Sequence, residues 1–239
     1  IDTPARLAQY AELASSRDVV LRINIELDVG LHRGGFVAGD SLRRALETLR
    51  DDEHMQFAGF VGYEPHVPAL PKLFGMRDRA LASAWQAYDE ALAVAATVLD
   101  AETMAGITRN AAGSPTYRLY RDTRIANEVS VGSALVKPAD FDTELLAPHQ
   151  PAAFIATPVL KTAQGVRLPG IEFAAGAMRL WDPNRAETVF TYGGHWLAQP
   201  VDPPGLIFNE TFGRSSNQEM LNAGARLDLA PDDFVFFRP

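Results

Sequence analysis

The stretch from Val19 to Phe36, which reads VVLRINIELDVGLHRGGF, constrains the fold more than any other part of the chain. Every odd position from 19 to 29 is apolar, and this alternation predicts a β-strand. A parallel strand that helices cover on both faces is usually apolar throughout. One face of a barrel strand instead looks inward and becomes polar toward its carboxyl end. The even positions from 22 to 28 are polar, and Val20 is the exception, so we interpret Glu26 and Asp28 as barrel-facing residues.

The loop after this strand displays His32 and Arg33 between glycines. Gly30, Gly34 and Gly35 leave the backbone free to adopt left-handed angles and to approach a ligand closely. The loop is therefore a candidate ligand site. Because short motifs are weak evidence, a surface loop with a solvated arginine is the alternative interpretation.

The composition of the chain limits the kinds of molecule that it can bind and the chemistry that it can use. A net charge of -8 argues against nucleic acid or an anionic membrane as a partner, but it leaves room for a local phosphate pocket. The lack of cysteine excludes disulfides, cysteine nucleophiles and thiolate metal sites, and it fits a reducing, cytoplasmic location. No apolar run reaches membrane-spanning length, and the amino end does not resemble a signal peptide.

Helical and strand patterns alternate in the first two thirds of the chain, whereas short strand patterns with many prolines follow from about Pro151. The 239 residues allow a sizeable core. The predicted fold class is α/β followed by β, with a partial β/α barrel at 1–145, too short to close alone, and an antiparallel β domain at 146–239. Helices are predicted at Thr3–Ala14, Leu42–Arg50 and Arg77–Ala101, and strands at Val19–Val29, Met55–Gly62, Met104–Asn110, Asn127–Val136, 153–160, 189–192, 206–208 and 234–237.

Two loops of small residues have the composition of a phosphate cradle. The first contains Gly113, Ser114 and Thr116 and leads into a predicted helical turn. The second contains Gly132 and Ser133 within the predicted fourth strand. Free amides and hydroxyls in such loops can surround a phosphate dianion without a charged side chain.

Five features follow one another in the chain: ELDVGLHRGGF, Gly62-Tyr63-Glu64-Pro65-His66, Gly113-Ser114-Pro115-Thr116, the strand from Glu128 to Ser133 and the β domain. In this order they resemble the alanine-racemase-type (fold type III) enzymes that depend on pyridoxal phosphate. The nearest branch is the one with D-threonine aldolase and D-serine dehydratase. The resemblance implies the C-terminal portion of a pyridoxal-phosphate-binding (β/α)8 TIM barrel, followed by an incomplete β domain. Because the chain does not start with methionine, we expect a fragment that lacks its amino-terminal part.

Site residues follow from the resemblance position by position. Arg33 is implied to donate to the ring oxygen of the cofactor, and His66 to contact the ring or the substrate, although an ordinary loop histidine is the alternative. The phosphate is implied to lie against the two small-residue loops. Those loops contribute Gly113, Ser114, Thr116, Gly132 and Ser133.

A Schiff-base lysine on the first barrel strand is also implied, and none of the three lysines of the chain, Lys72, Lys137 and Lys161, has a fitting context. We expect this lysine upstream of Ile1; a degenerate relative without it is the alternative. The chain alone is then expected to be inactive, since the substrate amine has no linkage to displace.

No metal site is predicted. The branch places a His-x-Cys or His-x-Asp pair just beyond a segment like residues 233–239. It also has a Glu-His-Gly phrase where residues 211–218 stand here. His149 and His195 have no ligand-like companion nearby in the sequence. Whether the complete protein uses a divalent metal stays open.

The resulting hypothesis is a lyase that acts on a small D-amino acid, by aldol cleavage or dehydration of a β-hydroxy-D-amino acid. The resemblance also implies a homodimer. An amino-acid racemase is the nearest competing hypothesis, because the same cofactor serves racemisation. Two further hypotheses are a non-catalytic relative that binds pyridoxal phosphate and an unrelated half-barrel that binds no cofactor.

Overall fold

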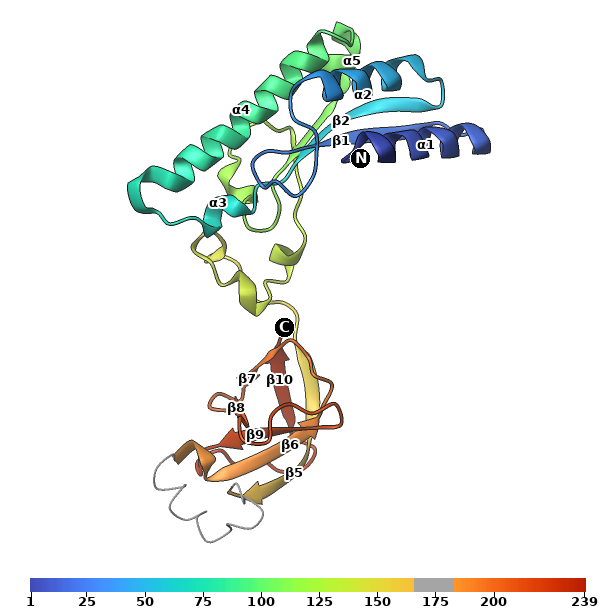
Figure 1. The fold of residues 1–239 in the computed structure, drawn as a ribbon. Helices are drawn as coiled ribbons and strands as arrows, with labels where there is room; N and C mark the ends of the chain where they lie inside the picture. Colours follow the sequence, from blue (N-terminus) through green and yellow to red (C-terminus); the bar gives the residue numbers. More distant parts are fainter. Residues whose placement is uncertain (166–182) are drawn as a thin grey trace. The chain divides into compact units, whose positions relative to one another are not determined.

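The computed structural model describes residues 1–165 and 183–239, and these residues form two compact units (Figure 1). Unit 1 comprises Ile1–Leu135 with Thr143–Leu146, and unit 2 comprises Val136–Asp142 with Ala147–Pro239. Because the units interleave between residues 135 and 147, the domain limit at residue 145 stays a prediction. Among the described residues, no helix is long and apolar enough to cross a membrane.

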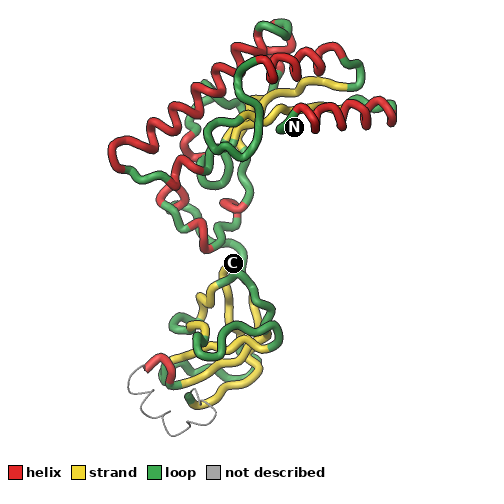
Figure 2. The backbone as a smooth tube through the Cα atoms, viewed as in Figure 1, coloured by secondary structure: helices red, strands yellow, loops and turns green. Residues whose placement is uncertain are grey.

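Unit 1 is built on a parallel sheet whose strands follow one another in chain order. α-Helices connect the first strand to the second and the second to the third, as the alternating sequence pattern predicts. Figure 2 distinguishes helices from strands by colour. The strands are β1 (Leu21–Leu27), β2 (Met55–Gly62), β3 (Thr108–Ala111) and β4 (Glu128–Val129), and the helices are α1 (Pro4–Arg17), α2 (Asp40–Asp51), α3 (His66–Ala69), α4 (Met76–Ala96) and α5 (Ala101–Gly106).

The core of unit 1 follows the sequence periodicities. In β1 the odd residues Ile23, Ile25 and Leu27 are buried, whereas the even residues stay partly or fully accessible. Helix α2 buries Leu42, Ala45, Leu46 and Leu49, which lie three or four residues apart and so share one face. Helix α4 likewise buries Ala84, Tyr88, Ala91 and Ala95, so Tyr88 is a core residue.

Two predicted strands of unit 1 differ most from the structure in their bounds, and the predicted helix Arg77–Ala101 ends earlier, at Ala96 of α4. The predicted strand Met104–Asn110 begins inside α5, because Asp100 caps that helix by accepting a hydrogen bond from the amide of Thr103 at 2.7 Å. The predicted strand Asn127–Val136 shrinks to the two residues of β4. Beyond it, the amides of Gly132 and Ala134 donate to the hydroxyl of Ser114 instead of to a neighbouring strand.

Unit 2 contains an antiparallel sheet with the strand order β7-β10-β5-β6-β9-β8. Its core includes Val159, Val189, Leu221, Val235 and Phe237. The four strands predicted from alternating patterns are present, and β7 and β9 are additional. The bounds are β5 (Ile155–Gln164), β6 (Glu187–Tyr192), β7 (Gln199–Asp202), β8 (Ile207–Phe208), β9 (Gln218–Ala223) and β10 (Phe234–Arg238).

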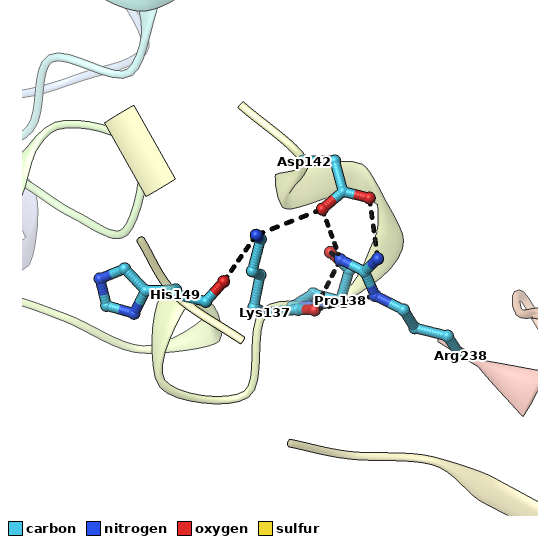
Figure 3. Close-up of polar contacts among 5 residues, drawn as sticks. All are labelled: Lys137, Pro138, Asp142, His149 and Arg238. Carbon is cyan, nitrogen blue, oxygen red and sulfur yellow. Dashed lines mark hydrogen bonds and ion pairs between the residues drawn. The ribbon is translucent and has the colours of Figure 1, made fainter. Parts of the chain in front are cut away.

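Arg238 of β10 forms hydrogen bonds with the first segment of unit 2, Val136–Asp142 (Figure 3). The guanidinium of Arg238 donates to both carboxylate oxygens of Asp142 at 2.8 Å and to the carbonyl oxygens of Lys137 and Pro138. The ammonium of Lys137 in turn donates to the carbonyl of His149 at 2.7 Å. We call the contacts of Arg238 with residues 137, 138 and 142 the Arg238 clamp.

Candidate functional site

The seven residues predicted to bind the cofactor lie in the loops that follow the four strands of unit 1. Residues 28–36 follow β1, 63–66 follow β2, 112–116 follow β3 and 130–133 follow β4. The carboxyl ends of parallel strands meet at one edge of a sheet, which is the usual place for a ligand in β/α folds. Contacts of Tyr63, His66 and Ser114 join these loops to one another.

The loop after β1 is organised by Asp28. One carboxylate oxygen accepts hydrogen bonds from the amides of Gly30 and His32 at 3.0 Å, and the other lies 2.9 Å from Nδ1 of His32. Partial burial opposes ionisation of Asp28, but these hydrogen bonds outweigh it and hold its pKa below the usual value. The amide of Asp28 donates to the carbonyl of Phe36, and the amide of Phe36 donates to the carbonyl of Glu26. These backbone hydrogen bonds close the loop that carries Arg33.

Gly35 explains why the loop needs a glycine at its closing end. Its φ is +98°, which favours glycine, and an added Cβ would lie only 2.6 Å from the backbone nitrogen of Asp28. This position in the sequence motif therefore has a steric cause, independent of any ligand.

Tyr63 joins the loop after β1 to the loop after β3. The guanidinium carbon of Arg33 lies 5.5 Å from the centre of the Tyr63 ring, within the range of a cation–π contact. The Tyr63 ring also packs against Gly113 in the loop after β3, where an added Cβ would overlap the ring. The sequence did not single out Tyr63, because the contacts that give it importance come from two separate loops.

His66 begins α3 and packs against the loop after β1. Its Nε2 would lie 3.2 Å from a Cβ placed on Gly30, so glycine permits this close packing. Its Nδ1 is buried without a hydrogen-bond partner among the described residues. Burial, helped by the neighbouring His32, lowers the pKa of His66 and favours the neutral ring. Because this nitrogen is buried, the contact of His66 with a cofactor stays a prediction.

The two small-residue loops are tied together by hydroxyl groups. Ser114 Oγ accepts hydrogen bonds from the amides of Gly132 and Ala134, both at 3.0 Å. Thr116 Oγ1 accepts from the amide of Gly113 at 3.2 Å. The predicted cradle residues therefore lie together, but two of the predicted amide donors already bond within the chain. A phosphate would exchange these bonds or use adjacent donors such as the exposed Ser133.

Glu64 is a buried acidic residue between Tyr63 and His66 that sequence reasoning missed. It is 1% exposed, and its Oε2 accepts a hydrogen bond from the hydroxyl of Tyr120 at 3.0 Å. Burial raises the pKa of Glu64, and hydrogen bonds from Thr116 and Tyr120 offset part of that effect. The signal available in the sequence was an acidic residue directly after a buried strand, which alone does not distinguish a buried carboxylate from an exposed one.

None of the three lysines lies in the four loops. Lys72 is exposed and forms an ion pair with Glu144 within unit 1. Lys137 and Lys161 belong to unit 2, where the first donates to His149 and the second lies 4.6 Å from the centre of the Phe190 ring. The Schiff-base lysine expected upstream of Ile1 stays a prediction.

The four loops together suit an aromatic ligand that carries a phosphate. Arg33 offers an exposed cation beside an aromatic ring, and Ser133 offers an exposed hydroxyl next to Gly132. A Cβ added at Gly132 would meet only Ser114 Oγ, at 3.9 Å, so there is room for a group of the ligand at this point. The residues present therefore fit a pyridoxal-phosphate ring and phosphate, but they provide no amine for covalent attachment.

Comparisons with known proteins bear on the same part of the chain. Residues 1–140 match the family described as "Alanine racemase, N-terminal domain". No curated protein matches the chain. Among solved structures, D-threonine aldolase from Filomicrobium marinum matches with a TM-score of 0.71 and 18% identity, over 100% of this chain and 60% of that chain.

Alanine racemases of known structure are similar to the chain as well. The enzyme from Streptomyces lavendulae has a TM-score of 0.66 and 17% identity, over 99% of this chain and 61% of that chain. The enzyme from Bacillus anthracis has a TM-score of 0.66 and 14% identity, over 99% and 59%. These similarities confirm the predicted fold class, a parallel β/α part followed by an antiparallel β part. The chain spans about 60% of the length of these proteins.

Proposed function

Because the chain belongs to the alanine racemase N-terminal domain family, we propose that it is part of an enzyme that uses pyridoxal phosphate to act on a small D-amino acid. The observation that carries this proposal is the junction of four loops at the carboxyl ends of β1 to β4. A cation, an aromatic ring, an unpaired imidazole nitrogen and a hydroxyl-lined phosphate cradle are brought together there.

Each group has a role in the proposed complex. Arg33 binds the ring oxygen, and the Tyr63 ring supports its guanidinium. His66, as the neutral ring that its lowered pKa favours, contacts the cofactor ring or the substrate. Ser114, Thr116 and Ser133, with Gly113 and Gly132, surround the phosphate.

The proposed reaction is aldol cleavage or dehydration of a β-hydroxy-D-amino acid. Bound pyridoxal phosphate supplies an electron sink for the bonds at the α-carbon of an amino acid. The similarity to D-threonine aldolase supports the lyase, and the similar TM-scores of the alanine racemases support a racemase as the second candidate. The lysine that would attach the cofactor is not assigned to a residue of this chain, and a homodimer remains part of the proposal.

Cofactor binding is tested by titrating the 239-residue chain with pyridoxal phosphate and following tryptophan fluorescence. We expect Arg33→Ala to weaken binding about tenfold, because it removes a charge-assisted hydrogen bond. Arg44→Ala, which changes an exposed arginine on α2, is the matched control and should bind as the unchanged chain does. Equal affinities of the two variants would contradict the role of Arg33, and no binding by the unchanged chain would contradict the cofactor site.

The reaction is tested on the full-length protein with D-threonine, D-serine and D-alanine. Glycine with acetaldehyde identifies aldol cleavage, pyruvate with ammonia identifies dehydration, and L-alanine identifies racemisation. Binding of pyridoxal phosphate without any of these products would favour the non-catalytic relative.

A further inference from the structure

Glu64 combines burial with a central position in the site. The three residues Tyr63, Glu64 and His66 lie within one short loop, yet each contacts a different neighbour. Tyr63 packs against Gly113, and His66 packs against Gly30. Glu64 contacts the segment after Gly113, where its carboxylate accepts from Tyr120 at 3.0 Å. This single loop therefore holds both of its neighbouring loops.

The contacts of Glu64 lead directly to the phosphate cradle. The oxygen of Thr116 accepts from the amide of Gly113 at 3.2 Å. The carbonyl of Gly113 also accepts from the amides of Thr116 and Tyr117. Residues 113–120 thus form a compact turn, which Tyr120 connects to the carboxyl group of Glu64.

Burial excludes direct contact of Glu64 with a substrate. The residue is 1% exposed, and Oε1 has no hydrogen-bond partner among the described residues. An isolated carboxyl group is costly to bury, whereas an apolar residue of similar size would avoid that cost. The hydrogen bond from Tyr120 gives the carboxyl group a specific use that an apolar side chain cannot replace.

We propose that Glu64 is a positioning residue that holds residues 112–120 in the conformation that receives the phosphate of the ligand. The proposal rests on the proposed function for the identity of that ligand. Glu64 acts through Tyr120 and does not touch the cofactor.

Hydrogen exchange of the unliganded chain tests the positioning role without any ligand. We expect amide exchange in peptides from residues 112–120 to become about tenfold faster in Glu64→Ala, because local opening follows the loss of these hydrogen bonds. Glu64→Gln keeps a carbonyl acceptor and should restore most of the protection. Tyr120→Phe removes one hydroxyl and should give a smaller increase in the same peptides.

Leu46→Ala is the control for general destabilisation, since Leu46 is fully buried in α2. It should accelerate exchange across unit 1 without singling out residues 112–120. Unchanged exchange of these residues in all three site variants, or an increase spread as evenly as in the control, would overturn the positioning role. If Glu64→Ala does not fold, the glutamine and phenylalanine variants still decide it.

A second experiment tests whether the positioning role of Glu64 affects binding of the phosphate group of pyridoxal phosphate. The dissociation constants for pyridoxal phosphate and for pyridoxal are compared for each variant. Glu64→Ala should weaken pyridoxal phosphate about tenfold and leave pyridoxal nearly unchanged, a split that loss of packing alone does not produce. An equal loss for both ligands would contradict positioning of the phosphate cradle. If the unchanged chain itself does not distinguish the two ligands, the proposed phosphate site is wrong, and the exchange data alone decide whether Glu64 orders the loop.

Discussion

Single residues of the loop after β1 have roles that the structure separates from ligand binding. Asp28 accepts two backbone amides and the ring of His32, and its side chain is 15% exposed. It therefore orders the loop, while Arg33 remains exposed. The motif that joins these residues has two causes, one structural and one proposed to be functional.

Asp28→Asn should destabilise unit 1 by about 1 kcal/mol at neutral pH, because an amide is a weaker acceptor than a carboxylate. Burial opposes ionisation of Asp28 in the folded chain, but hydrogen bonds from His32 and Gly30 outweigh it and lower the pKa. The stabilising contribution of Asp28 is thus complete above the unfolded pKa, about 3.9, and disappears as the pH falls through the lower folded value. Urea unfolding between pH 7 and pH 3 should show the two proteins converging below about pH 4.

Asp89→Asn, on the exposed side of α4, provides the control. Its unfolding free energy should stay within about 0.5 kcal/mol of the unchanged chain at neutral pH, as for most surface substitutions. A difference for Asp28→Asn that persists unchanged down to pH 3 would mean that the charge of Asp28 does not stabilise the loop.

Residue identities could be predicted from the sequence where a local motif carries them. Arg33, the glycines around it and the small-residue loops stand out because composition alone marks them. Tyr63 and Glu64 do not, since their importance comes from Gly113, Thr116 and Tyr120, which lie on another loop. The binding roles themselves stay predictions.

At the scale of elements, periodicity predicted the interiors of strands and helices better than their ends. Strand β2 has the predicted bounds, Met55–Gly62. It also contains an irregularity that no local pattern shows: Ile23 pairs with Phe57 but Asn24 pairs with Gly59, so Ala58 is an extra residue. Such a bulge depends on the register of two strands, and a single strand does not encode it visibly.

Gly59→Ala should be strongly destabilising, by about 3 kcal/mol or more, because backbone strain and steric overlap act together. Gly59 has a φ of +147°, and an added Cβ would overlap the backbone of Thr108 in β3. The comparison is Gly106→Ala in α5, where an added Cβ meets nothing within 4 Å. Alanine there should be neutral or stabilising by up to about 1 kcal/mol.

Chemical denaturation of both glycine variants measures the difference. The two substitutions add the same methyl group, so opposite signs would show that the close approach of β2 and β3, and not glycine content, sets the stability. Similar small effects at both positions would contradict the bulge and its register.

At the scale of the whole molecule, the sequence predicted a β/α part and a β part but not the way the chain passes between units. Residues 136–142 belong to unit 2, residues 143–146 return to unit 1, and unit 2 resumes at Ala147. Arg238, about a hundred positions away, makes the contacts that hold the first of these segments. Contacts of this sequence separation have no local signature, which explains why a single limit at residue 145 was the simplest prediction.

The Arg238 clamp is expected to fix residues 136–142 onto unit 2. Arg238→Lys keeps the positive charge but loses the planar, two-point contact with Asp142 and the bonds to two carbonyls. We expect the thermal transition of unit 2 to fall by about 5 °C and amide exchange in residues 136–142 to rise. Arg226→Lys, at an exposed position of the same unit, is the matched control and should change neither quantity. Equal behaviour of the two variants would mean that the backbone path of residues 136–142 is held by other contacts, such as the hydrogen bonds of Ala139 to Pro239 and of Ala152 to Val136.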